Sequence, residues 1–209
     1  MAGKRSYGDR CGMARALDVV GDRWALLVVR ELLLGPKRFT DLRAGLPRVT
    51  PDVLAQRLRD LEADGVLRHL KLPPPASAHV YELTARGEEL EPVLLELGRW
   101  GSAEPFPAGV LGADAFVLAL KTMFDPGRRN GDARVELRIG EDRYDAQLHD
   151  DRFDVARGAA DGAQATIEGD PATLADVTWH GRSLDALEIT GDERAVKRFL
   201  RAFAAPGAA

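Results

Sequence analysis

The chain has 209 residues, 45% of them hydrophobic and 30% charged, which is enough to bury one large core or two small ones. No apolar run approaches the roughly 18 residues of a membrane span, and no signal-peptide core follows Met1, so we expect a cytoplasmic protein. The single cysteine, Cys11, excludes an internal disulfide framework.

Charge is unevenly distributed along the chain. The formal net charge is −4, yet residues 1–71 contain fourteen Lys and Arg against nine Asp and Glu, so the remainder is strongly acidic. This asymmetry indicates a part that binds phosphates joined to a part that avoids polyanions. We expect two domains, 1–104 and 105–209.

Two helices are predicted near the start of the chain. Residues 11–20 carry apolar side chains at helical spacing, and residues 21–23 interrupt them. Residues 24–34 are apolar on nearly all sides, which predicts a central buried helix that ends at Gly35-Pro36.

Residues 40–65 predict two short helices joined by a turn. Leu46-Pro47 ends the first, Thr50-Pro51 opens the second with an N-cap hydroxyl and a proline, and Gly65 stops it. Leu54, Leu58 and Leu61 form one apolar stripe, so Asp52, Gln56 and Arg59 project from the other side. The pattern fits a helix-turn-helix whose second helix enters the DNA major groove, and it equally fits a helical hairpin with a solvated face.

Two β-prone segments follow, residues 66–72 and 79–83, with a proline-rich loop between them. A hairpin directly after a recognition helix is typical of a winged helix. Thr84 can cap a further helix, which Pro92 should kink. Its apolar stripe belongs to a dimer interface or, alternatively, to the domain core; the stripe consists of Leu90, Val93, Leu94, Leu97 and Trp100.

Several spaced blocks in residues 8–101 resemble the HxlR-type transcriptional regulators. They are Gly21-Asp22-Arg23-Trp24, residues 30–39, residues 54–65 and Tyr81-Glu82-Leu83-Thr84-Ala85-Arg86-Gly87. The resemblance implies a winged helix-turn-helix homodimer on a pseudo-palindromic double-stranded DNA operator, with recognition helices in successive major grooves.

Within this frame we expect base contacts from Thr50 and Gln56. Gln suits adenine, whereas Asp52 repels phosphate unless it accepts from a cytosine amino group. Lys37 and Arg38 precede the first helix of the pair, where a backbone phosphate would lie, and Arg57 is either an ion-pair partner or a DNA contact. The phosphate contacts expected are Arg38, Arg43, Arg48 and Arg59, with a secondary contribution from Lys71 and His79 of the wing.

Cys11 falls where similar regulators carry an amino-terminal cysteine that in some members senses oxidants or electrophiles. Lys4, Arg5, Arg10 and Arg15 could lower its pKa and so favour a reactive thiolate. The alternative is a small buried apolar residue.

A second domain follows a linker at residues 104–109. Residues 111–124 predict a helix, and three alternating runs predict an antiparallel meander with one buried face. A fourth strand ends at Asp170-Pro171, which caps a helix, and a similar unit at Asp192 opens the last helix. The chain as a whole is therefore expected to be α+β with a mainly antiparallel second-domain sheet.

This element order is similar to the sterol-carrier-protein fold, and the likeness lies in residues 169–174 and 181–184. It implies a hydrophobic small-molecule site, and the alternative is a closed core made of the same residues. The site residues expected are Phe116, Leu120, Met123, Tyr144, Phe153 and Trp179.

The histidines are scattered without metal-ligand spacing, and no nucleophile elbow or phosphate-binding glycine loop occurs. We therefore expect no enzyme, metal or cofactor. The favoured hypothesis is a homodimeric regulator, a repressor rather than an activator, whose second domain senses a hydrophobic small molecule. The alternatives are a thiol-based redox regulator acting through Cys11 with a structural second domain, and a carrier of hydrophobic metabolites.

Overall fold

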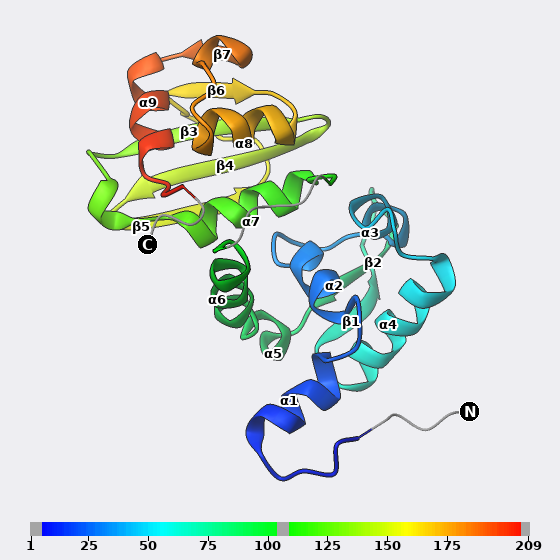
Figure 1. Ribbon diagram of the computed structural model, residues 1–209. Helices are drawn as coiled ribbons and strands as arrows, with labels where there is room; N and C mark the ends of the chain where they lie inside the picture. The colour runs from blue at the N-terminus through cyan, green and yellow to red at the C-terminus, as the bar shows by residue number, and fades with distance from the viewer. Residues whose placement is uncertain (1–5, 104–108, 206–209) are drawn as a thin grey trace. The chain divides into compact units, whose positions relative to one another are not determined.

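A computed structural model describes residues 6–103 and 109–205. The chain forms two compact units, one up to Leu94 and one from Leu95 onward, and the division falls within α6 (Figure 1). The domain boundary predicted at residues 104 and 105 lies outside the described residues. The first unit contains α1 (Gly12–Val20), α2 (Ala25–Leu32), α3 (Phe39–Gly45), α4 (Pro51–Ala63), β1 (Leu67–Lys71), β2 (His79–Leu83) and α5 (Ala85–Glu88), and α6 (Glu91–Gly101) continues from it.

The core of the first unit forms around α2. Val28 and Val29 are completely buried there, and the leucine stripe of α4 and Leu42 of α3 pack against them. The predicted helix at 24–34 is confirmed in type but shorter, because Trp24 adopts a left-handed conformation with φ of 79° and Leu33 begins a turn. The helix is not apolar on all sides, since the buried Glu31 lies among its hydrophobic residues.

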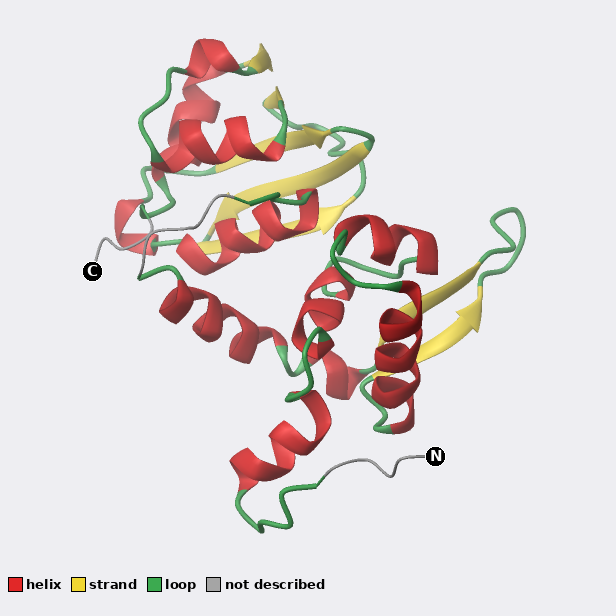
Figure 2. Ribbon diagram, turned by 45° about the vertical axis from the view of Figure 1, so that its right-hand side comes forward, coloured by secondary structure: helices red, strands yellow, loops and turns green. Residues whose placement is uncertain are grey.

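The predicted hairpin is present as β1 and β2, which pair antiparallel from Leu67 opposite Leu83 to Lys71 opposite His79. Figure 2 shows this hairpin projecting with its loop extended. Lys37 adds a third, one-residue strand, because its backbone N–H and C=O both bond to Tyr81. The hairpin is thereby tied to the segment before α3 and to the end of α2.

The helix predicted from Thr84 to Trp100 is divided in two. Thr84 caps the short α5 by accepting from the N–H of Gly87, and a turn at Glu89 and Leu90 separates α5 from α6. Pro92 is the second residue of α6, where its missing N–H costs no hydrogen bond. The expectation of a kinked continuous helix was therefore wrong.

The second unit is a five-stranded sheet with helices on one face (Figures 1 and 2). The strand order is β5-β4-β3-β6-β7; β3 and β6 are parallel and all other neighbours are antiparallel. The elements are α7 (Ala113–Met123), β3 (Ala133–Ile139), β4 (Asp142–His149), β5 (Arg152–Arg157), β6 (Ala165–Glu168), α8 (Pro171–Trp179), β7 (Glu188–Gly191) and α9 (Glu193–Arg201), with 3-10 turns at Pro126–Arg128 and Leu184–Ala186.

Apolar and polar residues alternate along the strands, and this alternation explains which face of the sheet the helices cover. Val135 and Leu137 of β3 and Tyr144 of β4 are buried beneath the helices, whereas Arg134 and Arg138 lie on the opposite face. The predicted caps are confirmed, because Asp170 accepts from the N–H groups of Ala172 and Thr173 at the start of α8. The α+β class and the mainly antiparallel sheet are thus observed. Among the described residues no helix is both long and apolar enough to cross a membrane.

Candidate nucleic-acid interface

The amino end of α4 is fixed by its own sequence. The Thr50 hydroxyl accepts from the N–H of Val53 at 3.4 Å, and Pro51 is the first helical residue. Leu54, Leu58 and Leu61 are at most 1% exposed and hold the helix against the core. The opposite side of α4 is therefore presented to solvent.

That outer side contains a chain of polar contacts centred on Gln56. Arg59 donates to Gln56 Oε1 at 2.7 Å, and Gln56 Nε2 donates to Asp60 Oδ1 at 2.7 Å. An amide oxygen accepts two hydrogen bonds and an amide nitrogen donates two, so each end of Gln56 keeps capacity for a further partner. The amide is held in one orientation and remains able to bind a base edge.

Arg57, which the sequence left open between two roles, is an ion-pair partner. Its guanidinium contacts Asp22 before α2 and lies 3.1 Å from Asp60, and its side chain is 18% exposed. It ties α4 to the turn between α1 and α2.

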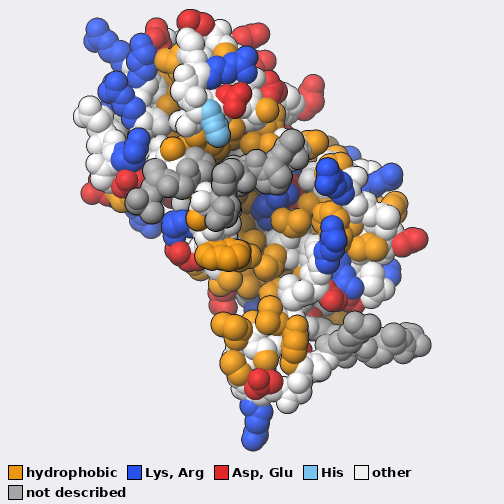
Figure 3. Space-filling model, viewed as in Figure 1, with side chains coloured by type: hydrophobic (Ala, Val, Ile, Leu, Met, Phe, Trp, Pro, Cys, Tyr) orange, Lys and Arg blue, Asp and Glu red, His pale blue; other side chains and the backbone are white. Residues whose placement is uncertain are grey.

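The other residues predicted to contact DNA are all exposed. Basic side chains lie over α3 and α4 in Figure 3, with acidic side chains among them. The exposed residues are Arg38, Arg43, Arg48, Thr50, Asp52, Gln56, Arg59, Lys71 and His79. Lys37 is different, because its ammonium lies 2.7 Å from the buried Glu31, and the expectation that it faces a phosphate is corrected.

The hairpin places a small aromatic group beside α4. His69 stacks on Tyr81 with ring centroids 4.5 Å apart and lies 5.3 Å from His79. The backbone N–H of His69 donates to Glu62 of α4 at 3.2 Å. Burial raises the pKa of the Tyr81 hydroxyl, and the charge of Glu62 adds to the rise. Lys71 and His79 form the outermost pair of the hairpin.

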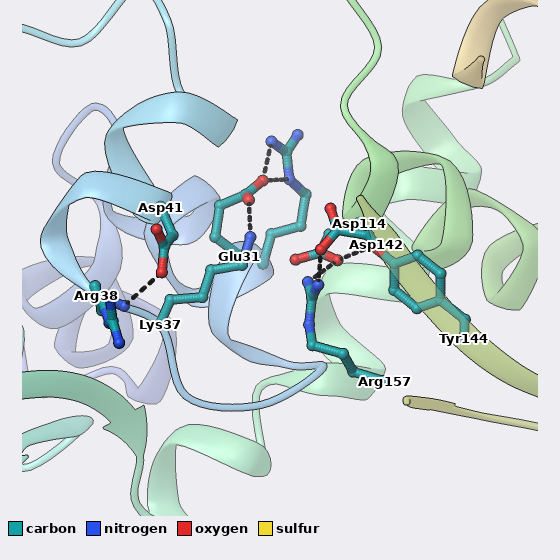
Figure 4. A network of polar contacts seen from close by, with 9 residues as sticks. Glu31, Lys37, Arg38, Asp41, Asp114, Asp142, Tyr144 and Arg157 are labelled. Carbon is teal, nitrogen blue, oxygen red and sulfur yellow. Dashed lines mark hydrogen bonds and ion pairs between the residues drawn. The ribbon is translucent and has the colours of Figure 1, made fainter. Parts of the chain in front are cut away.

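Sequence reasoning missed the buried charge cluster at Glu31 (Figure 4). Glu31 is 2% exposed and accepts from Arg30 and from Lys37, each at 2.7 Å. A methyl group at Gly45 would lie 2.2 Å from Glu31 Oε2, so this glycine leaves room for the carboxylate. The sequence did contain one signal for this cluster, because a glutamate stands inside a mostly apolar run.

The residues predicted for a dimer interface divide into two groups. Leu90 and Leu94 pack against the core of their own unit. Val93, Leu97 and Trp100 are 53%, 47% and 79% exposed and recur at i, i+4 and i+7 along α6. This second group is an apolar stripe open to solvent.

Cys11 is the exposed N-cap residue of α1. The N–H groups of Ala14 and Met13 at the helix amino end lower the pKa of its thiol. We expected the effect from basic side chains instead, but Arg10 and Arg15 are not among its causes, and Lys4 and Arg5 lie outside the described residues. The alternative of a buried apolar cysteine is corrected, because the side chain is open to solvent.

The six residues predicted for a small-molecule site all lie in the second unit, in separate groups of contacts. Phe116 of α7 and Trp179 of α8 have ring centroids 5.6 Å apart. Phe153 packs in an aromatic cluster with Phe199 and Phe203. Leu120 is fully buried, and Met123 is 8% exposed.

Tyr144 belongs to a polar network beneath the helices (Figure 4). Its hydroxyl donates to Asp114 at 2.5 Å, and Arg157 pairs with both Asp114 and Asp142. Burial raises the pKa of Tyr144, and the negative charge of Asp114 adds to the rise. The network joins α7 to β4 and β5.

Comparison with known proteins places the first unit in a family. A family model described as HxlR-like helix-turn-helix matches residues 19–105. The HTH-type transcriptional regulator YvaP of Bacillus subtilis (strain 168) is 36% identical over 88 residues, which are 42% of this chain and 82% of YvaP. The chain belongs to the HxlR-like helix-turn-helix family. This HxlR-like chain is a DNA-binding transcriptional regulator and not an enzyme.

Other members and structures match the same part. The regulator YodB of B. subtilis is 33% identical over 88 residues, which cover 42% of this chain and 79% of YodB. The crystal structure of quinone-bound YodB is 29% identical, covers 44% of this chain and 97% of that chain, and has a TM-score of 0.39. The structure of the redox regulator HypR in its oxidized form is 33% identical and has a TM-score of 0.42. The match covers 46% of this chain and 100% of the HypR chain. The family match ends at residue 105, so any role of the second unit is inferred from its own geometry.

Proposed function

We propose that this HxlR-like regulator acts as a homodimeric repressor, with α4 of each protomer in the major groove of a pseudo-palindromic operator. The observation that carries the proposal is the outer side of α4, where Gln56 is oriented by Arg59 and Asp60 and exposed to solvent. The amino-terminal residues of a recognition helix contact base edges, and helices of a dimer meet half-sites roughly one DNA turn apart.

Individual contacts follow from side-chain chemistry. Gln56 suits adenine through paired hydrogen bonds, Thr50 can donate its hydroxyl proton, and Asp52 accepts from a cytosine amino group. Arg38, Arg43, Arg48 and Arg59 meet phosphates, and Lys71 and His79 add contacts from the wing. The base contacts select sequence and the phosphate contacts set affinity.

Fluorescence anisotropy with DNA selected from a random pool tests this proposal. The logarithm of affinity should fall with that of salt concentration at a slope of about −0.9 per phosphate contacted. Gln56→Ala should lose roughly 1–3 kcal/mol of discrimination at one base pair per half-site. Arg43→Gln, the matched control, should weaken all sequences equally and flatten the slope. A flat salt response in the wild type would overturn the proposal.

The exposed stripe of α6 supports the homodimer. Val93, Leu97 and Trp100 place large apolar side chains in water, and such surfaces mark interaction sites. A two-fold partner presenting the same stripe would cover them, since the interface of a symmetric dimer is self-complementary.

We further propose that the second unit binds a hydrophobic effector beside Trp179. The indole Nε1 of Trp179 is buried and has no hydrogen-bond partner among the described residues, and the ring contacts Phe116. A buried donor without a partner costs free energy that a ligand acceptor would recover. The ligand class is therefore an apolar molecule with a carbonyl or hydroxyl oxygen.

Thermal shift and tryptophan fluorescence with decanoic acid and with 2-decanone test this second step. Either compound should raise the melting temperature of the wild-type protein and should release that protein from operator DNA. Trp179→Phe keeps an aromatic ring beside Phe116 but lacks the donor, so the shift should fall. Trp24→Phe, in the first unit, is the matched control. Binding without release of DNA would favour a carrier, and absence of binding by both compounds would overturn the effector site.

A thiol switch is the second candidate, favoured by the exposed Cys11 with its lowered pKa. If it operates, diamide should release operator DNA from the wild type but not from Cys11→Ser. Ligand-dependent release should survive in Cys11→Ser if the second unit is the switch.

A further inference from the structure

Val53 interrupts the polar outer side of α4. It is 39% exposed and is the one large hydrophobic side chain of α4 that is open to solvent; the whole of this helix is described. About two fifths of the Val53 side chain is left in water, and a β-branched residue lowers helix propensity slightly. What distinguishes Val53 from other exposed apolar residues is its place in the amino-terminal part of α4, the part of a recognition helix that contacts base edges.

The position of Val53 is defined by the helix cap. Its N–H donates to Thr50, so Val53 lies in the first turn of α4. It also lies one turn before Gln56 at i, i+3, where side chains are neighbours on the helix surface. The two residues are about 4.5 Å apart along the helix axis, close to the roughly 3.4 Å between successive base pairs.

We propose that Val53 is a specificity-determining residue that contacts the C5 methyl group of a thymine next to the base pair bound by Gln56. Thymine is the one DNA base with a methyl group in the major groove, and apolar side chains recognise it by contact. With adenine bound by Gln56, α4 selects two adjacent A·T pairs. The inference rests on the proposed operator binding of α4.

Uracil substitution tests the contact because it removes only the methyl group. The full-length protein is first used to select duplexes from a random pool, and each thymine of the selected half-site is then replaced singly by uracil. One substitution should weaken wild-type binding about fourfold per half-site, the equivalent of about 0.8 kcal/mol for one buried carbon. Val53→Ala should bind the thymine and uracil duplexes equally.

The matched control is Leu27→Ala, which shortens another exposed apolar residue, 36% exposed on α2. It should keep the thymine preference of the wild type. Thermal melting checks that both variants fold. Selective binding with no uracil effect coupled to Val53 overturns this inference and leaves the proposed function intact. Binding without any sequence preference overturns the proposed function and this inference together.

Discussion

At the scale of single residues, Glu31 joins three segments of the first unit. Its carboxylate binds Arg30 of α2 and Lys37 of the added strand, and it fills the space left by Gly45 at the end of α3. Lys37 in turn pairs through its backbone with Tyr81. One buried charge therefore positions both the hairpin and the first helix of the helix-turn-helix.

Glu31→Gln should destabilise the first unit by about 3–5 kcal/mol. The glutamine keeps the shape but removes the negative charge that Glu31 places beside the Lys37 ammonium, whose side chain is 11% exposed. Removing one partner of a buried ion pair costs this much because the other charge stays buried. Urea unfolding followed by circular dichroism measures the loss.

Glu82→Gln is the matched control in the same unit. Its partner Arg68 has a side chain that is 66% exposed, so the pair is screened by water. The loss should stay below about 1 kcal/mol. Equal losses in the two variants would contradict the role assigned to Glu31.

At the scale of elements, the central strand β3 carries a buried carboxylate on the face opposite the helices. Glu136 is 6% exposed and accepts from the N–H of Ala160 at 3.0 Å and from Arg138. The hydrogen bond from Ala160 and the contact with Arg138 lower the pKa of Glu136. The carboxylate thus holds the segment after β5 against the sheet.

Acid should destabilise the second unit partly through Glu136. Because its pKa is lowered on folding, its contribution is complete above the unfolded value of about 4.3 and is lost as pH falls through the folded value. Glu136→Gln should therefore be less stable at pH 7 and lose less stability between pH 7 and pH 3.

Urea midpoints at the two pH values measure the difference. Glu188→Gln, on the exposed strand β7 of the same sheet, is the matched control and should follow the wild type. Identical pH dependence in wild type and Glu136→Gln would contradict the prediction.

Local chemistry made many elements predictable from sequence. Thr50-Pro51 and Asp170-Pro171 each combine an N-cap acceptor with a proline whose missing N–H is not needed, and both helices begin there. The outward side of α4 followed from its leucine spacing. The exposure of Gln56 and Arg59 was predictable for that reason.

Long-range pairing was not predictable in the same way. Nothing local in residues 165–168 selects β3 as a parallel neighbour, because hydrophobic alternation fixes which face is buried but not the partner strand. The backbone pairing of Lys37 with Tyr81 also joins residues that are distant in sequence. Val53 was missed because periodicity describes which side a residue occupies, not what would contact it.

At the scale of the whole molecule, the two units differ in what they offer to partners. The exposed side of α4 and most of the family match, residues 19–105, lie in the first unit. The second unit contributes the indole donor of Trp179, which is buried without a hydrogen-bond partner among the described residues. A ligand can change DNA affinity only if it favours one dimer geometry over another. In the proposed mechanism, regulation by the second unit therefore depends on the dimer interface.

Leu97→Ser combined with Trp100→Ser should dissociate the dimer. Aromatic side chains at the centre of an interface commonly contribute at least about 2 kcal/mol, and a two-fold axis places each change in the interface twice. Dimerisation should weaken by more than about 30-fold, measured by sedimentation velocity over a concentration series. Operator affinity should fall with it, because a monomer engages one half-site.

Val110→Ser is the control for this double variant. It removes exposed apolar surface without touching the proposed interface. Val110 is 86% exposed and lies outside α6, so its replacement should leave both sedimentation and operator binding unchanged. If the double variant of α6 sediments as the wild type does, the exposed stripe is not the dimer interface. The spacing of the two recognition helices would then have to be set by another surface, such as the exposed side of α1 with Met13 and Leu17.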